Sequence, residues 1–428
     1  MNNWPIVPLG SEVTFFSGGT PSKDETKYWG GEIPWVSSAE MTQRRIKKTT
    51  HSVTVDGAKN GTRLVPAKTV LVVVRGMSLA KEFRVSISER ELTFNQDIKA
   101  LSPKNTLDPS FLFYYLLSQS QAIKDSASEA AHGTKKVDMP VLENWPLPLP
   151  PRTDQEKIAA ILSLYDDLIE SNQRRIALLE KMAEEIYREW FVRMRFPGHK
   201  QVKFEKGIPR GWDTDKACEF FDVVKGKSYG SDELTENTQH MPFITLKSFN
   251  RGGGYREDGL KYYSGSYKED QVVFLNDVVM AVTDMTQDRV VVGRVARVPN
   301  LGSRGAVISL DVIKLAPKKM TGTFLYSYMR HSGFADFIKE FANGANVLHL
   351  KPDLVAQQKI IVPTKSLQEE FSKIVEPIYE KIDVISMANK QMTTIRDMLL
   401  PRLISGKFSV EALDIQFPPS MQESGHDQ

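Results

Sequence analysis

Basic side chains in this sequence gather in short segments that recur in both halves of the chain. Lysine and arginine neutralise the phosphates of nucleic acids, while arginine, asparagine and glutamine can also read base edges. A single basic residue is more often a solvated surface charge, so only groups at corresponding places are informative. Arg75, which follows an apolar run, is the strongest individual candidate. The full set of candidate nucleic-acid-binding residues is Arg44, Arg45, Arg75, Lys81, Arg84, Lys135, Lys136, Lys225, Lys227, Lys247, Arg251, Arg289, Asn346 and His349.

The sequence lacks the motifs of DNA-modifying and ATP-driven enzymes. A DNA methyltransferase needs a glycine-rich cofactor turn that opens a helix, and an Asn/Asp-Pro-Pro-aromatic motif. The two Pro-Pro pairs here follow Leu149 and Phe417 instead. The glycine triplet at residues 252–254 lies in a polar stretch, and we interpret it as a flexible loop. There is no Walker motif, so we expect no ATP-driven motor.

The sequence also shows no clear pattern for a metal site or for a catalytic nucleophile. A metal nuclease needs clustered carboxylates with a nearby lysine, and no such cluster is visible. The histidines form no i, i+4 pair and Cys218 is the single cysteine, which argues against a zinc cluster. A Ser/His/Asp triad stays open on sequence alone, although no nucleophile elbow is visible. We therefore expect a binding protein with no catalytic site, no metal and no cofactor.

Length and composition indicate a soluble protein of several folded units. The 428 residues are too many for one ordinary core, and 41% hydrophobic with 25% charged residues is a globular composition. A net charge of +3 is too small to indicate nucleic acid by itself, so contacts must come from local patches. The first ten residues lack a signal-peptide pattern, and the run at 70–74 is far shorter than a membrane span of about 20 residues. We expect a cytoplasmic protein.

A sequence unit of about two hundred residues is repeated along the chain. Single matches between apolar residues mean little, but an ordered series with small insertions indicates a true repeat. The alternative is that the chain has two unrelated α/β domains whose apolar residues are similarly spaced. Aligned pairs include Trp4 with Trp212, Gly18 with Gly226, Phe111 with Phe324, Pro150 with Pro363 and Ile169 with Ile382.

Each unit begins with a mixed α/β part. Apolar runs between Gly- and Pro-rich turns predict strands at residues 69–74, 97–101, 278–282 and 290–295. Short helices are predicted at residues 111–118 and 324–329. The repeat and the order of these elements predict two globular domains of the same kind.

A long amphipathic helix then closes each unit, at about residues 154–192 and 367–400. Asp154 is the expected N-cap of the first helix, Pro377 a possible kink in the second, and Pro401 its end or a bend. Helices of this length can pair with each other and hold two globular heads apart; the alternative is that each packs only on its own head. The apolar positions that suggest a heptad seam are Ile158, Ile161, Tyr165, Leu168, Ile176, Leu179, Ala183, Ile186 and Trp190, then Phe371, Ile374, Ile378, Ile382, Met392, Ile395 and Leu399.

Several segments in this order resemble the specificity subunits of type I restriction–modification systems. Each segment alone is weak, but their order and spacing cover the whole chain except its polar tail. The second unit departs from the pattern, because Lys225-Gly226-Lys227-Ser228 replaces the Gly-Gly-Thr-Pro run and Gly344-Ala345 replaces Gly-Thr. The matching segments are GGTPSK (18–23), KYWGG (27–31), IPWV (33–36), FNQ (94–96), GT (133–134), LPLPP (147–151), EWF (189–191), FPG (196–198), GW (211–212) and RDMLLPRL (396–403).

The resemblance implies an α+β architecture. This architecture consists of two α/β target-recognition domains in pseudo-repeat, joined by two long antiparallel coiled-coil-like helices. It also implies double-stranded DNA as ligand, each domain reading half of a split site, and two methyltransferase subunits with motor–nuclease subunits as partners. The expected segments are recognition domain 1 at 1–151, the central helix at 152–200, recognition domain 2 at 201–364, the C-terminal helix at 365–412 and a disordered tail at 413–428.

A fixed helical spacer would have a measurable consequence. A helix of about 35 residues is roughly 50 Å long, which corresponds to about fifteen base pairs of DNA. We therefore expect two short half-sites separated by a fixed gap. Two other functions stay open: a self-sufficient restriction endonuclease or methyltransferase with undetected motifs, and a structural adaptor that binds protein through its helices.

Overall fold

The computed structural model describes residues 4–129 and 134–421. The chain divides into two compact units, Met1–Asn172 with Ala388–Gln428 (unit 1) and Gln173–Met387 (unit 2). Each long helix contributes to both units, so this division does not test the predicted domain boundaries. Within the two described ranges, no helix is long and apolar enough to cross a membrane.

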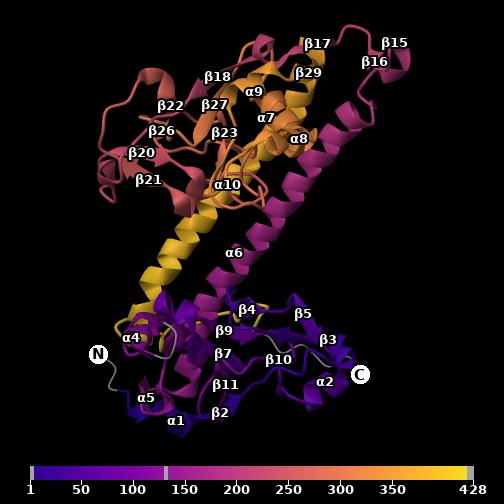
Figure 1. The fold of residues 1–428 in the computed structure, drawn as a ribbon. Coiled ribbons are helices and arrows are strands. Elements are labelled where there is room, and N and C mark those ends of the chain that lie inside the picture. Colours follow the sequence, from indigo (N-terminus) through magenta and orange to yellow (C-terminus); the bar gives the residue numbers. More distant parts are fainter. Residues whose placement is uncertain (1–3, 130–133, 422–428) are drawn as a thin grey trace. The chain divides into compact units, whose positions relative to one another are not determined.

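Unit 1 is built on two sheets and several short helices (Figure 1). The five-stranded sheet has the order β2 (Val13–Ser17), β11 (Ile98–Pro103), β7 (Val70–Val73), β9 (Val85–Ser88) and β4 (Arg45–Ile46). The four-stranded sheet has the order β5 (His51–Val53), β3 (Trp29–Val36), β10 (Leu92–Phe94) and β6 (Leu64–Val65). The other elements are β1 (Ile6–Pro8), α1 (Leu9–Glu12), α2 (Val55–Lys59), α3 (Pro109–Ser118), α4 (Ser120–Asp125), α5 (Met139–Glu143) and β14 (Pro146–Pro148).

Strand β7 explains why the sequence is apolar without alternation at this point. Val70 and Val72 pack on one face of the sheet, in the core that includes α3 and the start of the first long helix. Leu71 and Val73 pack on the other face, against the four-stranded sheet. A strand that is buried on both faces loses the polar alternation of a half-exposed strand.

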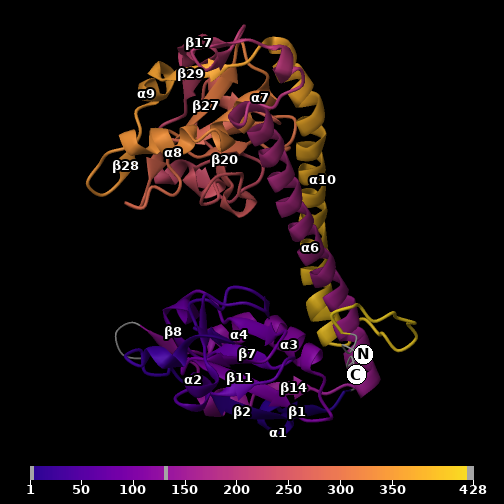
Figure 2. The same cartoon turned by 90° about the vertical axis from the view of Figure 1, so that its right-hand side faces the viewer.

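Unit 2 repeats this plan (Figure 2). One sheet has the order β18 (Phe221–Lys225), β27 (Val312–Pro317), β23 (Val278–Ala281) and β25 (Val295–Arg297). The other has the order β19 (Leu234–Thr235), β21 (Lys261–Tyr263), β20 (Met241–Ile244), β26 (Ala306–Ile308) and β22 (Val272–Val273). Further elements of unit 2 are β15 (Phe204–Glu205), β16 (Ile208–Pro209), β17 (Asp213–Lys216), α7 (Gly322–His331), α8 (Phe334–Ile338), α9 (Pro352–Gln357) and β29 (Lys359–Val362).

The two units share their strand order, which confirms the predicted pseudo-repeat. The order β2–β11–β7–β9 corresponds to β18–β27–β23–β25, and unit 1 adds β4 at the edge. The parallel pair β3 with β10 in unit 1 corresponds to the parallel pair β20 with β26 in unit 2, and the added strand β4 makes a second parallel pair with β9. The short helices α3 and α7 follow the corresponding strands β11 and β27, as the sequence predicts.

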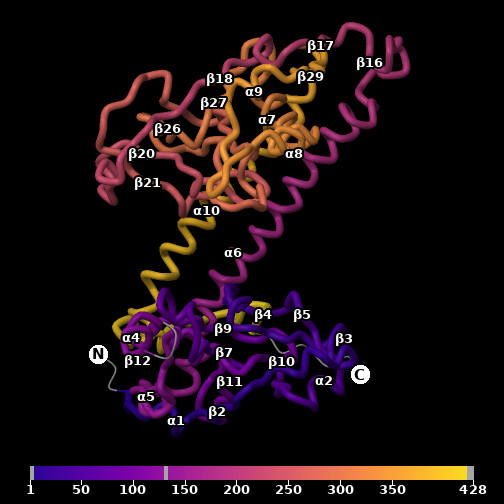
Figure 3. Tube along the Cα trace, viewed as in Figure 1, coloured from indigo at the N-terminus to yellow at the C-terminus, as the bar shows by residue number. Residues whose placement is uncertain are grey.

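The long helices are α6 (Arg152–Tyr187), which ends in a π-helical turn at Arg188–Val192, and α10 (Lys365–Ile404). Asp154 is not the N-cap, because α6 begins two residues earlier and the Asp154 amide already donates to the Pro151 carbonyl. Pro401 does not end α10 either, since the helix continues to Ile404. In unit 1 the two helices run antiparallel (Figure 3). Asn172 lies beside Asn389, and Asp166 lies beside Arg396.

The predicted heptad seam is only partly buried. Leu168, Ile374 and Ile395 are 43%, 46% and 45% exposed, whereas Leu162 and Val375 are fully buried. The sequence pattern assumed one partner per helix, but in each unit the helices also pack against the β-rich part of the fold. This second contact rotates the buried face away from the predicted seam.

The strand predicted at residues 290–295 is wrong over most of its length. Residues 290–294 form a turn and only Val295 belongs to a strand, because Gly293 adopts a positive φ of 78° and Asp284 accepts the backbone N–H groups of Val291 and Val292. The glycine triplet 252–254 is a hydrogen-bonded turn in which all three residues have positive φ. Gly133, part of a motif used above, lies outside the described residues.

Candidate nucleic-acid interface

A small antiparallel ribbon in unit 1 brings three of the predicted residues together. Its strands are β8 (Arg75–Gly76), β13 (Lys135–Lys136) and β12 (Ser128–Glu129). Lys136 pairs with Arg75 in the register, and Lys135 pairs with Gly76. Gly76 has a positive φ of 134°, which only glycine adopts without strain, and a short 3-10 turn follows. Arg75 and Lys136, which are far apart in the sequence, thus form one basic surface with Lys135.

The charges on this ribbon are mostly available to a ligand. Arg75 and Lys136 are exposed, and Lys135 is half-buried. Lys136 forms an ion pair with Asp138 at 2.8 Å, and this contact, with a hydrogen bond from Ser128, lowers the pKa of Asp138. Exposed pairs of this kind exchange readily with other anions, because they contribute little stability.

Unit 2 has a corresponding ribbon with different chemistry. It consists of β24 (Thr283–Asp284) and β28 (Leu348–His349), with Thr283 paired to His349. The Thr283 hydroxyl lies 3.3 Å from Nδ1 of His349. Asn346 and His349 are exposed, and Gln287 donates a hydrogen bond to the Ala345 carbonyl at 3.2 Å. His349 therefore stands where unit 1 has Lys136, and Thr283 stands where unit 1 has Arg75, while the amide groups of Asn346 and Gln287 lie in the adjoining loops.

A buried carboxylate organises the loop beside this second ribbon. Asp284 is 2% exposed and accepts hydrogen bonds from the amides of Thr286, Val291 and Val292 and from the Thr286 hydroxyl. Burial alone would raise the pKa of Asp284, but these donors lower it, so the group stays ionised. The same loop carries Arg289, which forms an ion pair with Glu340. No sequence motif marked Asp284.

Three other predicted residues meet at a basic recess in unit 1. The recess measures about 450 Å³ and is lined by Arg44, Lys81 and Arg84, with Lys124 of α4 as a fourth cation. Arg84 is held by Glu82 and by the carbonyls of Ser38 and Ala39, so its guanidinium has a fixed position. Lys124 was missed because it lies in a helix, where a lone lysine carries no sequence signal.

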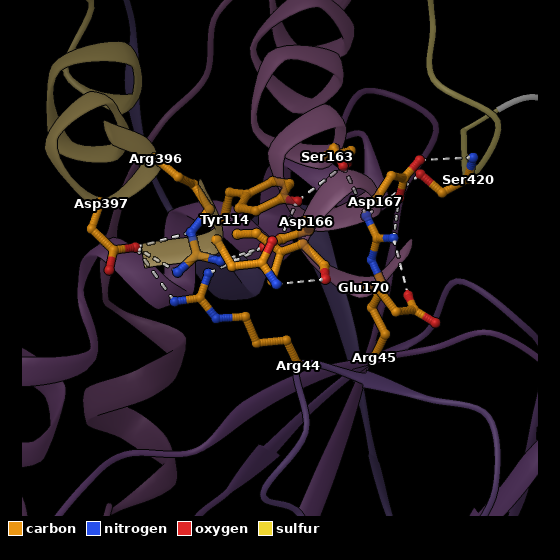
Figure 4. Close-up of polar contacts among 12 residues, drawn as sticks. Arg44, Arg45, Tyr114, Ser163, Asp166, Asp167, Glu170, Arg396, Asp397 and Ser420 are labelled. Atoms are coloured by element: carbon orange, nitrogen blue, oxygen red, sulfur yellow. Dashed lines mark hydrogen bonds and ion pairs between the residues drawn. The ribbon is translucent and has the colours of Figure 1, made fainter. Parts of the chain in front are cut away.

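The remaining candidates do not join either ribbon. Arg45 faces the long helices and forms an ion pair with Asp167, and Arg44, which also lines the recess, forms an ion pair with Asp166 (Figure 4). Lys225 lies 3.7 Å from Asp353, and Lys227 is half-buried beside Ser309. Lys247 and Arg251 are exposed on short turns. The structure therefore separates the predicted set into two ribbons, one recess and scattered surface charges.

Among the residues that the structure describes, no group of three His, Cys, Asp or Glu side chains is arranged to hold a metal ion.

Comparison with known proteins identifies the relatives of this chain. The sequence profile described as "Type I restriction modification DNA specificity domain" matches residues 1–181 and 209–393. The type I restriction enzyme MjaIX specificity subunit of Methanocaldococcus jannaschii is 27% identical over 433 residues, which covers 96% of this chain and 95% of that protein. The MjaVIII specificity subunit of the same organism is 23% identical and covers 96% of this chain and 94% of its own length.

A solved structure has the same fold. The crystal structure of the type I restriction-modification system S subunit from M. genitalium aligns with a TM-score of 0.59 and 17% identity. The alignment covers 94% of this chain and 97% of that one.

Proposed function

This chain belongs to the type I restriction modification DNA specificity domain family, and from that membership we infer that it is the non-catalytic specificity subunit of a type I restriction–modification complex in the cytoplasm. Double-stranded DNA is its ligand. Methyltransferase subunits, and through them motor–nuclease subunits, are its protein partners. The chain selects the DNA sequence, and the partners supply the chemistry.

The observation that carries the residue-level proposal is the ribbon that occurs once in each unit. The ribbons β8–β13 and β24–β28 follow the corresponding strands β7 and β23. We assign the first half of a split DNA site to Arg75, Lys135 and Lys136, and the second half to Asn346 and His349 with Gln287. Arginine suits guanine and the amides suit adenine, so the two ribbons are suited to different half-sites.

The exposed apolar side chains of the long helices supply a surface for the protein partners. Leu164 and Leu168 of α6 are 46% and 43% exposed, and Ile395 and Met398 of α10 are 45% and 55% exposed. Exposed apolar side chains that adjoin one another on a helix surface are typical of a protein interface. We propose that a methyltransferase subunit covers them.

Sequencing of modified bases in DNA tests the proposed function. Cells that express this chain with the methyltransferase encoded beside it should carry a split motif with methylated adenines in both halves. The motif should disappear when this chain is omitted, and an exchange of residues 1–151 for those of another member should change one half only. If the partner is folded and bound but no motif appears, the chain is a protein-binding adaptor and not a sequence reader.

A further inference from the structure

Arg45 connects the β-rich part of unit 1 to the first long helix. It lies on β4, the edge strand that unit 2 lacks, and its side chain is only 13% exposed. The guanidinium forms a close ion pair with Asp167 of α6 and lies 4.0 Å from Glu170. It also donates to the Ser163 carbonyl and to the Ser420 hydroxyl, both at 3.4 Å (Figure 4).

A second, more deeply buried set of charges lies beside it. Arg396 of α10 and Asp166 of α6 form a close ion pair and are 7% and 8% exposed. The Tyr114 hydroxyl of α3 donates to the other oxygen of Asp166 at 2.7 Å. Arg44 lies 3.6 Å from both Asp166 and Asp397. The strand β4, the helix α3 and both long helices therefore meet in one network (Figure 4).

This network has the properties of an orienting contact. A guanidinium presents its donors in a rigid plane, so a paired carboxylate fixes its direction as well as its distance. Water screens buried charges weakly, and removal of one partner leaves the other charge without compensation. A rotation of the β-rich part on the helices would break several of these contacts together.

Unit 2 has the same kind of connection made by different residues. Arg297 of β25 is 10% exposed, forms a close ion pair with Asp383 of α10 and stacks over the Tyr379 ring at 4.9 Å. Arg330 of α7 lies 3.5 Å from Glu180 of α6. In unit 1 the arginine lies on the added edge strand β4. In unit 2 it lies on β25, the strand that corresponds to β9 of unit 1. In both units an arginine of the β-rich part thus pairs with a carboxylate of a long helix, although the two arginines lie on strands that do not correspond in the repeat.

We propose that the Arg45–Asp167 and Arg297–Asp383 pairs are positioning contacts that fix each recognition domain on the long helices and so determine which gap between half-sites the protein accepts. This inference rests on the proposed function, since it needs a split DNA site. It also gives Arg45 a different role from the DNA contact that the sequence suggests. Arg45 acts through Asp167 and touches no DNA.

The test measures binding of the assembled complex, this chain with its methyltransferase partner, to DNA duplexes that differ only in the gap. The duplexes carry the native gap or a gap changed by one or two base pairs. Arg45→Ala and Asp167→Ala should each lower the preference for the native gap about tenfold, the equivalent of about 1.4 kcal/mol. The double variant should behave like either single variant, because both remove the same contact.

The two roles of Arg45 make opposite predictions for Asp167→Ala. If Arg45 contacts a phosphate, Arg45→Ala weakens binding to all gaps alike and makes it less dependent on salt. Removal of the Asp167 carboxylate would then leave binding equal or tighter. Preserved gap preference in both single variants would overturn the positioning role.

Two sets of variants control for folding. Arg256→Ala removes an exposed pair with Asp258 inside one turn of unit 2 and should leave gap preference unchanged. If either alanine variant unfolds, Arg45→Lys and Asp167→Asn keep the side-chain volume and still lose the paired geometry. If the unaltered complex binds all gaps equally, the proposed split-site function fails. If the unaltered complex prefers the native gap and the variants keep that preference undiminished, the positioning role fails.

Discussion

Gln155 in unit 1 makes the same three hydrogen bonds that Gln368 makes in unit 2. The Gln155 carbonyl oxygen accepts from the Asp108 amide, and its amide group donates to the carbonyls of Thr106 and Pro150. Gln368 accepts from the Thr321 amide and donates to the carbonyls of Lys319 and Pro363. Both glutamines are buried, and each ties the first turn of a long helix to the N-terminus of the short helix α3 or α7.

We expect Gln155→Ala to destabilise unit 1 by about 3 kcal/mol, because it leaves one amide and two carbonyls buried without partners. Hydrogen exchange of the amides at residues 106–111 should rise, while those at 319–324 stay protected. Gln368→Ala should give the reverse pattern. Gln121→Ala, which removes an exposed glutamine, should change stability by less than about 0.5 kcal/mol.

Arg75→Ala and Lys136→Ala should weaken DNA binding through the first half-site. Loss of a bidentate arginine–guanine contact costs about 1–3 kcal/mol and relaxes selectivity at one base, whereas loss of a phosphate contact weakens binding to all sequences. Binding titrations with single-base variants of each half-site distinguish the two cases. Asn346→Ala should change selectivity in the second half only. An equal change in both halves for either variant would contradict the assignment.

The repeat was predictable because it depends on apolar residues at fixed places in the chain. Pro150 and Pro363 align in sequence, and each accepts a hydrogen bond from the glutamine five residues later. The strand predicted at 69–74 and the helix predicted at 111–118 were predictable for the same reason. A continuous apolar run bounded by turns leaves few alternatives.

The ends and faces of the elements were less predictable. Leu168 fits a heptad pattern, but α6 packs against α10 and the β-rich part at once, and this rotates Leu168 to the surface. Asp284 gives no motif, because its four donors come from a turn that forms only in the folded chain. Arg45 resembles a surface charge in sequence, and its partner Asp167 lies more than one hundred residues away.

The polar pair Asn172–Asn389 should fix the register of the helices in unit 1. The Asn172 amide donates to the Asn389 side chain at 2.9 Å, and Asn389 donates to the Ile169 carbonyl at 3.4 Å. Asn389→Ala should destabilise unit 1 by about 1 kcal/mol. The double variant Asn172→Leu with Asn389→Leu should be more stable than the native chain in urea unfolding, at a loss of register specificity. Thr394→Ala, on the exposed face of α10, is the matched control and should have little effect.

The apolar surface of the long helices should be required for assembly. Leu168→Gln and Met398→Gln keep helix-forming residues and remove exposed apolar area, so each should reduce co-purification of the methyltransferase without lowering the melting temperature. Leu275→Gln changes an equally exposed leucine away from the helices and serves as the control. Full co-purification with both helix variants would remove this surface from the interface.

His331 should make the stability of unit 2 depend on pH. Burial, with repulsion from Arg330 and Arg188, lowers the pKa of His331 to about 3, whereas an unfolded histidine titrates near 6.5. The folded state therefore keeps the ring neutral while the unfolded state takes up a proton. Stability is fully present above pH 6.5 and declines as the pH falls toward 3. Urea unfolding of unit 2 at pH 7 and pH 5, followed by hydrogen exchange at residues 322–331, should show this loss. His331→Gln should have a flatter dependence over the same interval, and an equal slope in both proteins would show that other groups cause it.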